Sequence, residues 1–180
     1  MLKNIPNVLT ISRIIFIPLV LLCYSLGGKY GEIISATLFS LACITDFLDG
    51  YLARTFSAHS KLGKFLDPVA DKLLVGSVIL LLVYYRKAEL LPATAIICRE
   101  ILVSGLREFL AEIRVSVPVS NLAKIKTGFQ MSAIFMLLLG NDASGFIYMD
   151  LLGTIALWIA AGLTLFTGYV YLKAGLKHID

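Results

Sequence analysis

Most of this sequence consists of apolar runs of nearly bilayer length, separated by short polar segments. A helix needs about 20 predominantly apolar residues to cross the hydrocarbon core of a membrane. Backbone N–H and C=O groups in lipid need partners within the protein, so such runs form helices rather than open sheets. The sequence therefore predicts an all-α polytopic membrane protein with six transmembrane helices in a single domain, residues 1–180. The expected spans cover residues 8–26, 33–54, 66–85, 91–110, a run that follows Lys126 and reaches about Gly140, and 151–171.

The composition supports a membrane protein and argues against two other classes. Of the 180 residues, 58% are hydrophobic and 16% are charged, whereas a soluble domain carries about 25% charged residues. The net charge of +4 is better explained by membrane topology than by a nucleic-acid-binding surface. Cys23, Cys43 and Cys98 lie inside apolar runs without paired spacing, which indicates neither a disulfide framework nor a zinc site.

The distribution of positive charge predicts the orientation of the chain. Residues 1–13 are polar and contain Pro6, which is typical of a short N-terminal interfacial segment leading into the first span. With six spans, only Lys29, Arg86 and Lys87 fall on the side opposite the amino terminus. Because Lys and Arg favour the cytoplasmic side, we expect a multi-pass protein of the cell (inner) membrane with both termini in the cytoplasm.

Four aspartates lie between the second and third apolar runs, in the stretch DFLDGYLARTFSAHSKLGKFLDPVAD. Asp46 and Asp49 end one expected span, and Asp67 and Asp71 begin the next, so both pairs face the cytoplasm. Spacings of three or four residues keep each pair on neighbouring faces of a helix. Converging carboxylates repel one another unless cations or protons intervene. Mg²⁺ and Mn²⁺ take oxygen ligands and commonly hold substrate phosphates, so the pattern predicts a divalent-metal site.

Two other interpretations of these aspartates remain open. Asp67 before Pro68 is typical of an N-cap followed by proline at the first helical position. Carboxylates in a membrane protein can also form a proton or cation pathway, which makes a small cation transporter an alternative function. A transporter would be expected to distribute its acids near the midplane of the bilayer rather than at one end.

With the residues between them, the aspartates form the pattern D-x2-D-G-x2-A-R-x8-G-x3-D-x3-D. This pattern resembles the signature of the CDP-alcohol phosphotransferases, integral membrane enzymes of phospholipid synthesis. The resemblance implies that Asp46, Asp49 and Asp67 bind metal, and that Asp71 is the general base for the acceptor hydroxyl as well as a further ligand. The spacing alone does not distinguish a base from a ligand. The positions that the resemblance assigns to the nucleotide and the CDP-lipid are Asn7, Thr10, Arg13, Gly50, Ala53, Arg54 and Gly63.

Basic residues around the connection between the fourth and fifth spans predict an anionic acceptor, most of all a phosphate. Arg107 shares a helical face with Glu100 and Ser104, and we expect this face to look into the bundle or a polar cavity, because charges at such depth are costly in lipid. The residues predicted to hold the acceptor phosphate are Arg107, Lys124 and Lys126.

Three flanking runs, NIPNVLTISRIIFIP, CREILVSGLREFLAE and KIKTGFQM, resemble the members of this family that use glycerol 3-phosphate as acceptor. The implied reaction joins CDP-diacylglycerol to sn-glycerol 3-phosphate and gives phosphatidylglycerophosphate and CMP. The resemblance also suggests a homodimer surrounded by membrane lipids, with no nucleic-acid partner. The nearest alternative is the same chemistry with another acceptor, namely inositol phosphate, serine or phosphatidylglycerol.

Overall fold

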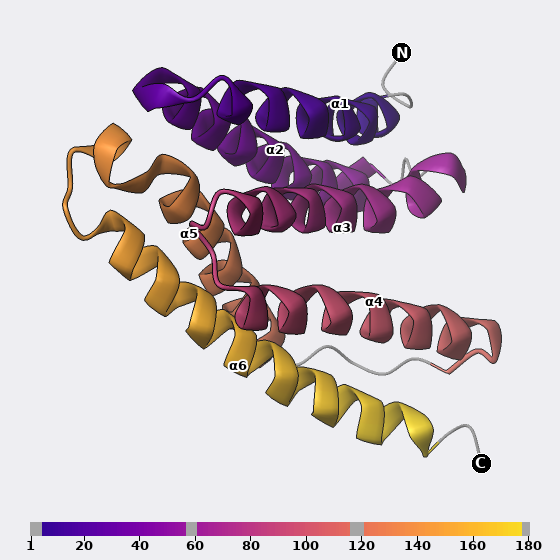
Figure 1. The fold of residues 1–180 in the computed structure, drawn as a ribbon. Helices are drawn as coiled ribbons and strands as arrows, with labels where there is room; N and C mark the ends of the chain where they lie inside the picture. Colours follow the sequence, from indigo (N-terminus) through magenta and orange to yellow (C-terminus); the bar gives the residue numbers. More distant parts are fainter. Residues whose placement is uncertain (1–4, 57–60, 116–120, 178–180) are drawn as a thin grey trace.

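The structure, a computed structural model, describes residues 5–56, 61–115 and 121–177. The side chains of residues 5–11, 46–56, 61–65, 67, 121 and 123, which lie within helices, fall outside the described part. Within the described ranges the chain forms helices and no strands, which confirms the all-α prediction (Figure 1). The helices are α1 (Ile5–Ser25), α2 (Gly28–Phe56), α3 (Lys61–Tyr84), α4 (Leu90–Glu112), α5 (Asn121–Ser144) and α6 (Met149–Leu176).

Each helix corresponds to one of the six expected spans, and the main differences are at helix starts. α1 begins at Ile5 and continues without a break to Ser25, so the described residues contain no separate interfacial segment before it. α6 is the one described helix that is long and apolar enough to cross a membrane by length and composition. In α1 the apolar stretch Ser12–Ser25 is shorter, and α2 to α5 carry more charged residues than α6. The six-span topology stays a prediction.

The start of α3 bears on one interpretation of the aspartates. α3 begins at Lys61, and Pro68 therefore lies inside the helix instead of at its first position. Because position 67 is also within the helix, the N-cap interpretation of Asp67 is wrong. The helix extends beyond the apolar run because polar residues such as Lys61 and Lys64 are also good helix formers.

The helices pack around one apolar core to which all six contribute. In Figure 1, α1 lies along both α2 and α3, while α5 and α6 form an antiparallel pair and α4 packs against α6. Fully buried side chains from the six helices meet at the centre, among them Val20, Phe39, Val78, Ile96, Leu137 and Leu157. Ser35 also joins α2 to α1 by donating a hydrogen bond of 3.1 Å to the Val20 carbonyl oxygen. This packing fixes the relative positions of α3, α4 and α5, which form the candidate site.

Away from the candidate site, a break in α5 lies where the α5–α6 hairpin contacts the loop between α3 and α4. Gly140 has φ 63° and ψ 178°, a left-handed conformation that glycine adopts without steric cost. Next to it, Lys87 forms an ion pair of 3.1 Å with Asp150, and the Asp150 backbone N–H donates to Asn141 Oδ1 at 2.9 Å. The predicted end of the fifth span near Gly140 therefore coincides with this break.

Candidate active site

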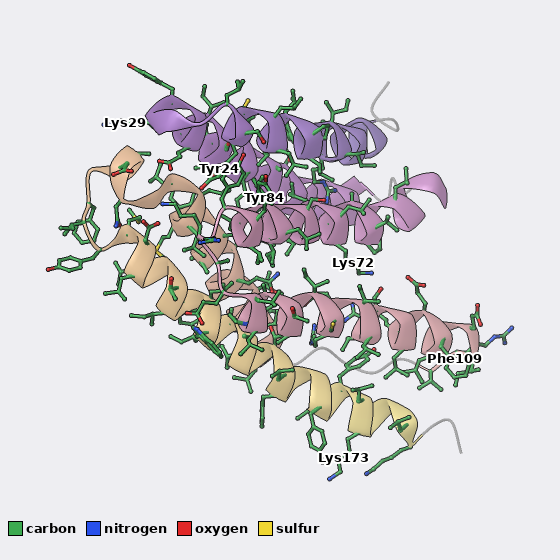
Figure 2. All side chains as sticks on the ribbon, viewed as in Figure 1. Tyr24, Lys29, Lys72, Tyr84, Phe109 and Lys173 are labelled. Carbon is green, nitrogen blue, oxygen red and sulfur yellow. The ribbon has the colours of Figure 1, made fainter. Side chains whose placement is uncertain are left out.

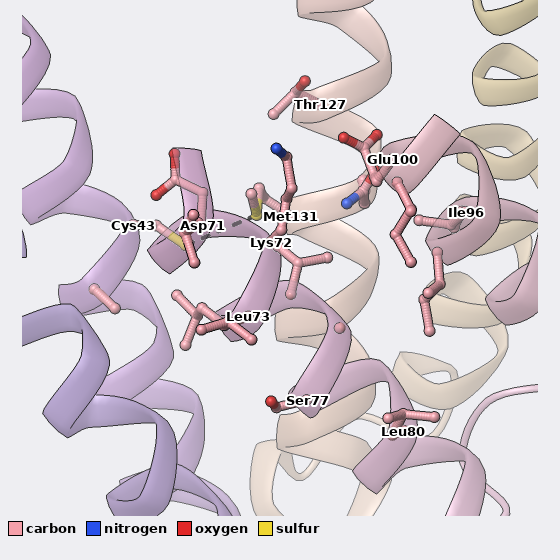
Figure 3. Close-up of a pocket in the computed structure, with 18 of the residues that line it drawn as sticks. Cys43, Asp71, Lys72, Leu73, Ser77, Leu80, Ile96, Glu100, Thr127 and Met131 are labelled. Carbon is pink, nitrogen blue, oxygen red and sulfur yellow. Dashed lines mark hydrogen bonds between the residues drawn. The ribbon is translucent and has the colours of Figure 1, made fainter. Parts of the chain in front are cut away.

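A cavity of about 710 Å³ lies between α3, α4 and α5, with α2 at its edge. This volume is in the range of small-molecule binding sites, roughly 300–1,000 Å³. Charged and polar side chains gather at one end, and apolar ones continue along α3 and α4 (Figure 3). The polar lining consists of Asp71, Lys72, Ser77, Glu100, Lys126, Thr127 and Gln130, of which Ser77 lies toward the apolar end. Such a lining suits a ligand that has both a polar or charged part and an apolar part.

Asp71 is the member of the aspartate pattern whose side chain the structure describes. Its carboxylate lies at the cavity and is 42% exposed, while its partner Arg13 from α1 is only 1% exposed. The Arg13 guanidinium donates a hydrogen bond to Asp71 Oδ1. Charge-assisted bonds of this kind are short and directional, so Arg13 fixes the orientation of the carboxylate from behind the cavity. Arg13 was predicted to contact the CDP-lipid, and in the structure it positions the Asp71 carboxylate.

Lys126 from α5 faces the same cavity and is held by α4. Its side chain is 5% exposed, and its ammonium donates a hydrogen bond to Glu100 Oε1. Glu100 also forms an ion pair of 3.1 Å with Arg99, and Arg99 in turn donates to Thr167 Oγ1 on α6 at 3.2 Å. A buried charge requires a partner and hydrogen bonds, and this chain of contacts supplies both across three helices.

Lys72 is a further cation at the cavity. It follows Asp71 directly in α3, and its ammonium donates a hydrogen bond to Ser104 Oγ on α4. Figure 2 shows its side chain extending from α3 toward α4. With Lys126 it places two positive groups in the cavity that Asp71 also lines, an arrangement that suits a phosphate-bearing ligand.

The structure brings only some of the predicted acceptor residues to the cavity. Lys126 lines it, and so does Glu100, which shares a helical face with Ser104 as expected. Arg107 does not line the cavity, because its guanidinium lies 5.7 Å from the ring centroid of Tyr171 on α6. Lys124 is exposed and does not line the cavity either. The phosphate-binding roles of Arg107 and Lys124 stay predictions without this support.

Most of the aspartate pattern falls on side chains that the structure does not describe. Positions 46–54 are in the last part of α2, positions 63 and 67 in the first turns of α3, and positions 7 and 10 in α1. The predicted residues concerned are Asp46, Asp49, Gly50, Ala53, Arg54, Gly63, Asp67, Asn7 and Thr10. Ala42 and Cys43 of α2 line the cavity, and position 46 follows Cys43 by about one helical turn.

Among the described residues, no group of three or more His, Cys, Asp or Glu side chains could hold a metal ion. Three of the four predicted ligands lie outside that part of the chain, so the metal prediction is neither supported nor contradicted by this result. Asp71, the described member, is an oxygen donor at the cavity. A set of carboxylates is the donor type that Mg²⁺ and Mn²⁺ prefer.

Sequence reasoning did not single out Lys72 or Gln130 as site residues. Gln130 follows Lys126 by four residues, so the two share one face of α5, and both line the cavity. Polar residues at this spacing in an otherwise apolar run were the available signal. Lys72 was not predicted, because a lysine near the start of an expected span usually serves as a topological charge.

These features define a bundle of helices with a partly charged, partly apolar cavity. The chain belongs to the CDP-alcohol phosphatidyltransferase family, whose model matches residues 3–166. A protein of Rickettsia felis named CDP-diacylglycerol–glycerol-3-phosphate 3-phosphatidyltransferase is 52% identical over 176 residues, which are 98% of this chain and 97% of that protein. Proteins of the same name from Pectobacterium atrosepticum and Pseudomonas fluorescens are each 41% identical. They cover 95% and 98% of this chain, and 94% and 92% of their own lengths, respectively.

Family membership confirms the resemblance drawn from the aspartate pattern and the flanking runs. A small cation transporter, the alternative from another class, is therefore not supported. The family match covers most of the chain, including every residue that lines the cavity.

Proposed function

We propose that this protein transfers the phosphatidyl group of CDP-diacylglycerol to sn-glycerol 3-phosphate, giving phosphatidylglycerophosphate and CMP. The near full-length relatives that carry the name of this activity support the proposal. The observation that carries it is the shared cavity of Asp71 and Lys126. One cavity thereby offers a carboxylate for an acceptor hydroxyl and a cation for an acceptor phosphate.

Asp71 is the proposed general base. The acceptor hydroxyl gives its proton to Asp71. The hydroxyl oxygen then forms a bond to the phosphorus atom next to the diacylglycerol. The bond from this phosphorus to the oxygen that bridges to CMP then breaks. Arg13 donates a hydrogen bond to Oδ1 and thereby holds the carboxylate at the cavity for proton transfer. Such proton transfer contributes about 10²–10⁴-fold to a rate.

The proposed metal site comprises Asp46, Asp49, Asp67 and Asp71, with two Mg²⁺ or Mn²⁺ ions. When bound, the ions would neutralise the carboxylates and the pyrophosphate charge. The proposed contacts to the nucleotide and CDP-lipid remain Asn7, Thr10, Arg13, Gly50, Ala53, Arg54 and Gly63.

Lys126 and Lys72 are the proposed contacts for the acceptor phosphate in the described part of the cavity. The ion pairs of Glu100 with Arg99 and with Lys126 hold the Lys126 ammonium at the cavity wall before the acceptor arrives. Pre-positioned charge of this kind lowers the cost of ordering a side chain on binding. Arg107 and Lys124 are retained as outer contacts, to be tested against Lys126.

Six membrane spans with both termini and the site in the cytoplasm remain the proposed topology. The helices have 21–29 residues, which at about 1.5 Å per residue is enough for a hydrocarbon core of roughly 30 Å. Lys29 and Lys173, predicted on opposite sides, lie at opposite ends of the bundle (Figure 2). The protein is further proposed to be a multi-pass protein of the inner membrane and to form a homodimer.

The proposal is tested by giving purified protein CDP-diacylglycerol, Mg²⁺ and one acceptor at a time. The acceptor panel contains sn-glycerol 3-phosphate, inositol phosphate, serine and phosphatidylglycerol, and CMP release is measured. We expect CMP release with sn-glycerol 3-phosphate and little with the others. Faster release with another acceptor would reassign the substrate, and no release with any acceptor would refute the enzyme class.

A further inference from the structure

Gln130 carries a buried polar atom for which the described residues provide no hydrogen-bond partner. Its side chain lines the cavity, the residue is only 3% exposed, and its Oε1 atom has no such partner in the described part of the chain. A carbonyl oxygen buried without a partner loses its hydrogen bonds to water with no replacement, which destabilises the folded state. Retaining such a group in an apolar helix therefore indicates a partner that enters the cavity.

The position of Gln130 limits which part of a ligand it can meet. It lies one helical turn beyond Lys126 on the same face of α5, about 6 Å along the helix axis. Lys126 and Glu100 mark the charged end of the cavity, where Asp71 also lies. Gln130 is thus adjacent to the phosphate-binding group but separate from it, and its carbonyl oxygen accepts hydrogen bonds but offers no positive charge.

A carbonyl oxygen without a partner is satisfied by a hydrogen-bond donor. The alcohol that accepts the phosphatidyl group supplies such a donor. In sn-glycerol 3-phosphate, one hydroxyl attacks phosphorus and the phosphate binds the cations. The central hydroxyl takes no part in the reaction. A buried carbonyl oxygen next to the cations is the complement of this remaining hydroxyl.

We propose that Gln130 recognises the non-reacting hydroxyl of the acceptor, so that the cavity selects a phosphorylated polyol over a phosphorylated simple alcohol. The inference rests on the proposed function and deepens it by assigning a specificity-determining residue. A site built to bind a hydroxyl rejects an analogue that lacks it, because its own polar group is then left unpaired.

The experiment compares two acceptors on two proteins. 3-Hydroxypropyl phosphate keeps the reacting hydroxyl and the phosphate of sn-glycerol 3-phosphate but lacks the central hydroxyl. We expect the wild-type protein to prefer sn-glycerol 3-phosphate in kcat/KM by about tenfold to a hundredfold. Gln130→Met, which removes the acceptor atom at similar volume, is expected to reduce this preference to about twofold or less.

A second measurement separates recognition from a structural role. Because Gln130→Met removes an unpaired buried polar group, we expect its midpoint of thermal unfolding to equal or exceed that of the wild type, by roughly 2 °C. Met131→Leu, which changes a neighbouring apolar residue of the same cavity, serves as the matched control and should keep the acceptor preference.

Three outcomes would overturn the inference. They are an unchanged preference in Gln130→Met, an equal loss of preference in Met131→Leu, and lowered stability in Gln130→Met with equal loss toward both acceptors. Failure of the proposed function is distinguishable, because it would appear as absent CMP release from the wild-type protein with sn-glycerol 3-phosphate.

Discussion

At the scale of single residues, the site depends on charges that are each held by a neighbouring helix. Asp71 on α3 is bound by Arg13 from α1, and Lys126 on α5 is bound by Glu100 from α4. Both functional groups are held in place by these contacts, which favours fast reaction of a correctly placed acceptor. Two substitutions test these roles separately.

Asp71→Asn keeps the size of the side chain but removes the proton acceptor. We expect kcat to fall by about 10²–10⁴-fold, while binding of CDP-diacylglycerol is largely retained. CMP release and equilibrium binding of the CDP-lipid measure the two effects. Asp142→Asn, an exposed position on α5, is the control, and normal turnover in Asp71→Asn would rule out the base assignment.

Lys126→Met removes the buried ammonium while Glu100 keeps its ion pair with Arg99. We expect the KM for sn-glycerol 3-phosphate to rise about tenfold to a hundredfold, because a charge-assisted bond to phosphate contributes roughly 1.5–3 kcal/mol. The KM for CDP-diacylglycerol should change little. Steady-state kinetics with each substrate varied in turn measures both.

Lys124→Met is the comparison variant for Lys126→Met, because it removes the same charge from an exposed side chain two positions away. Arg107→Ala tests the sequence-based prediction on the same scale. If Arg107→Ala or Lys124→Met raises the KM for the acceptor more than Lys126→Met, the cavity is not where the phosphate binds.

At the scale of helices, α1 is part of the active site although it lies outside the aspartate pattern. Arg13 is 1% exposed, so its guanidinium serves Asp71 rather than solvent. Position 13 was predicted from resemblance as a contact to the CDP-lipid. Its ion pair with Asp71 joins residues 58 positions apart in sequence, which no local pattern could indicate.

Arg13→Met tests Arg13 as a positioning residue. We expect kcat to fall about a hundredfold, since small misplacements of a reacting group cost up to that factor, and Arg13→Lys to restore part of it by keeping the charge. The pH profile of kcat should also change in Arg13→Met. Equal activity of Arg13→Met and wild type would show that Asp71 needs no partner on α1.

The α5–α6 pair depends on a close approach at Gly153. A Cβ atom there would lie 2.8 Å from the side chain of Leu137. Gly153→Val is therefore expected to destabilise the protein by about 1–3 kcal/mol through overpacking, measured by thermal unfolding in detergent. Gly162→Val on the same helix is the matched control, because no atom lies within 4 Å of its added Cβ. Equal stability of the two variants would contradict the packing described here.

At the scale of the whole molecule, the charged cavity residues Asp71 and Lys72 lie in the first half of α3, and the Lys87–Asp150 ion pair follows the end of this helix. The proposed topology puts the cavity on the cytoplasmic side, where a water-soluble acceptor can reach it. The opposite end then carries Lys29, Arg86 and Lys87.

Cysteine labelling in intact cells tests this orientation. After replacement of Cys23, Cys43 and Cys98, a cysteine at Lys29 is expected to react with a membrane-impermeant maleimide added from outside. A cysteine at Lys177 should react only after the membrane is opened. Labelling of both positions from the same side would refute an even number of spans.

The sequence was sufficient to predict the helices, since six apolar runs leave few other ways to satisfy the backbone in lipid. Helical periodicity and the cost of charge in lipid also predicted that the face of Glu100 would look into the bundle or a polar cavity, and Glu100 lines the cavity. The place of Arg107 was not predictable, because its contact is with Tyr171 on α6, distant in sequence. Gln130 was not predicted, because a single amide in an apolar run does not indicate which groups surround it in the fold.

The ion pair between Arg13 and Asp71 has a consequence for how the protein is made. α1 is synthesised before α3 and carries a buried cation that pairs with Asp71 of α3. The site is therefore complete only when the third helix has returned to the first. A version that lacked α1 would retain every aspartate and still be inactive, and co-expression of the missing helix as a separate peptide should restore it.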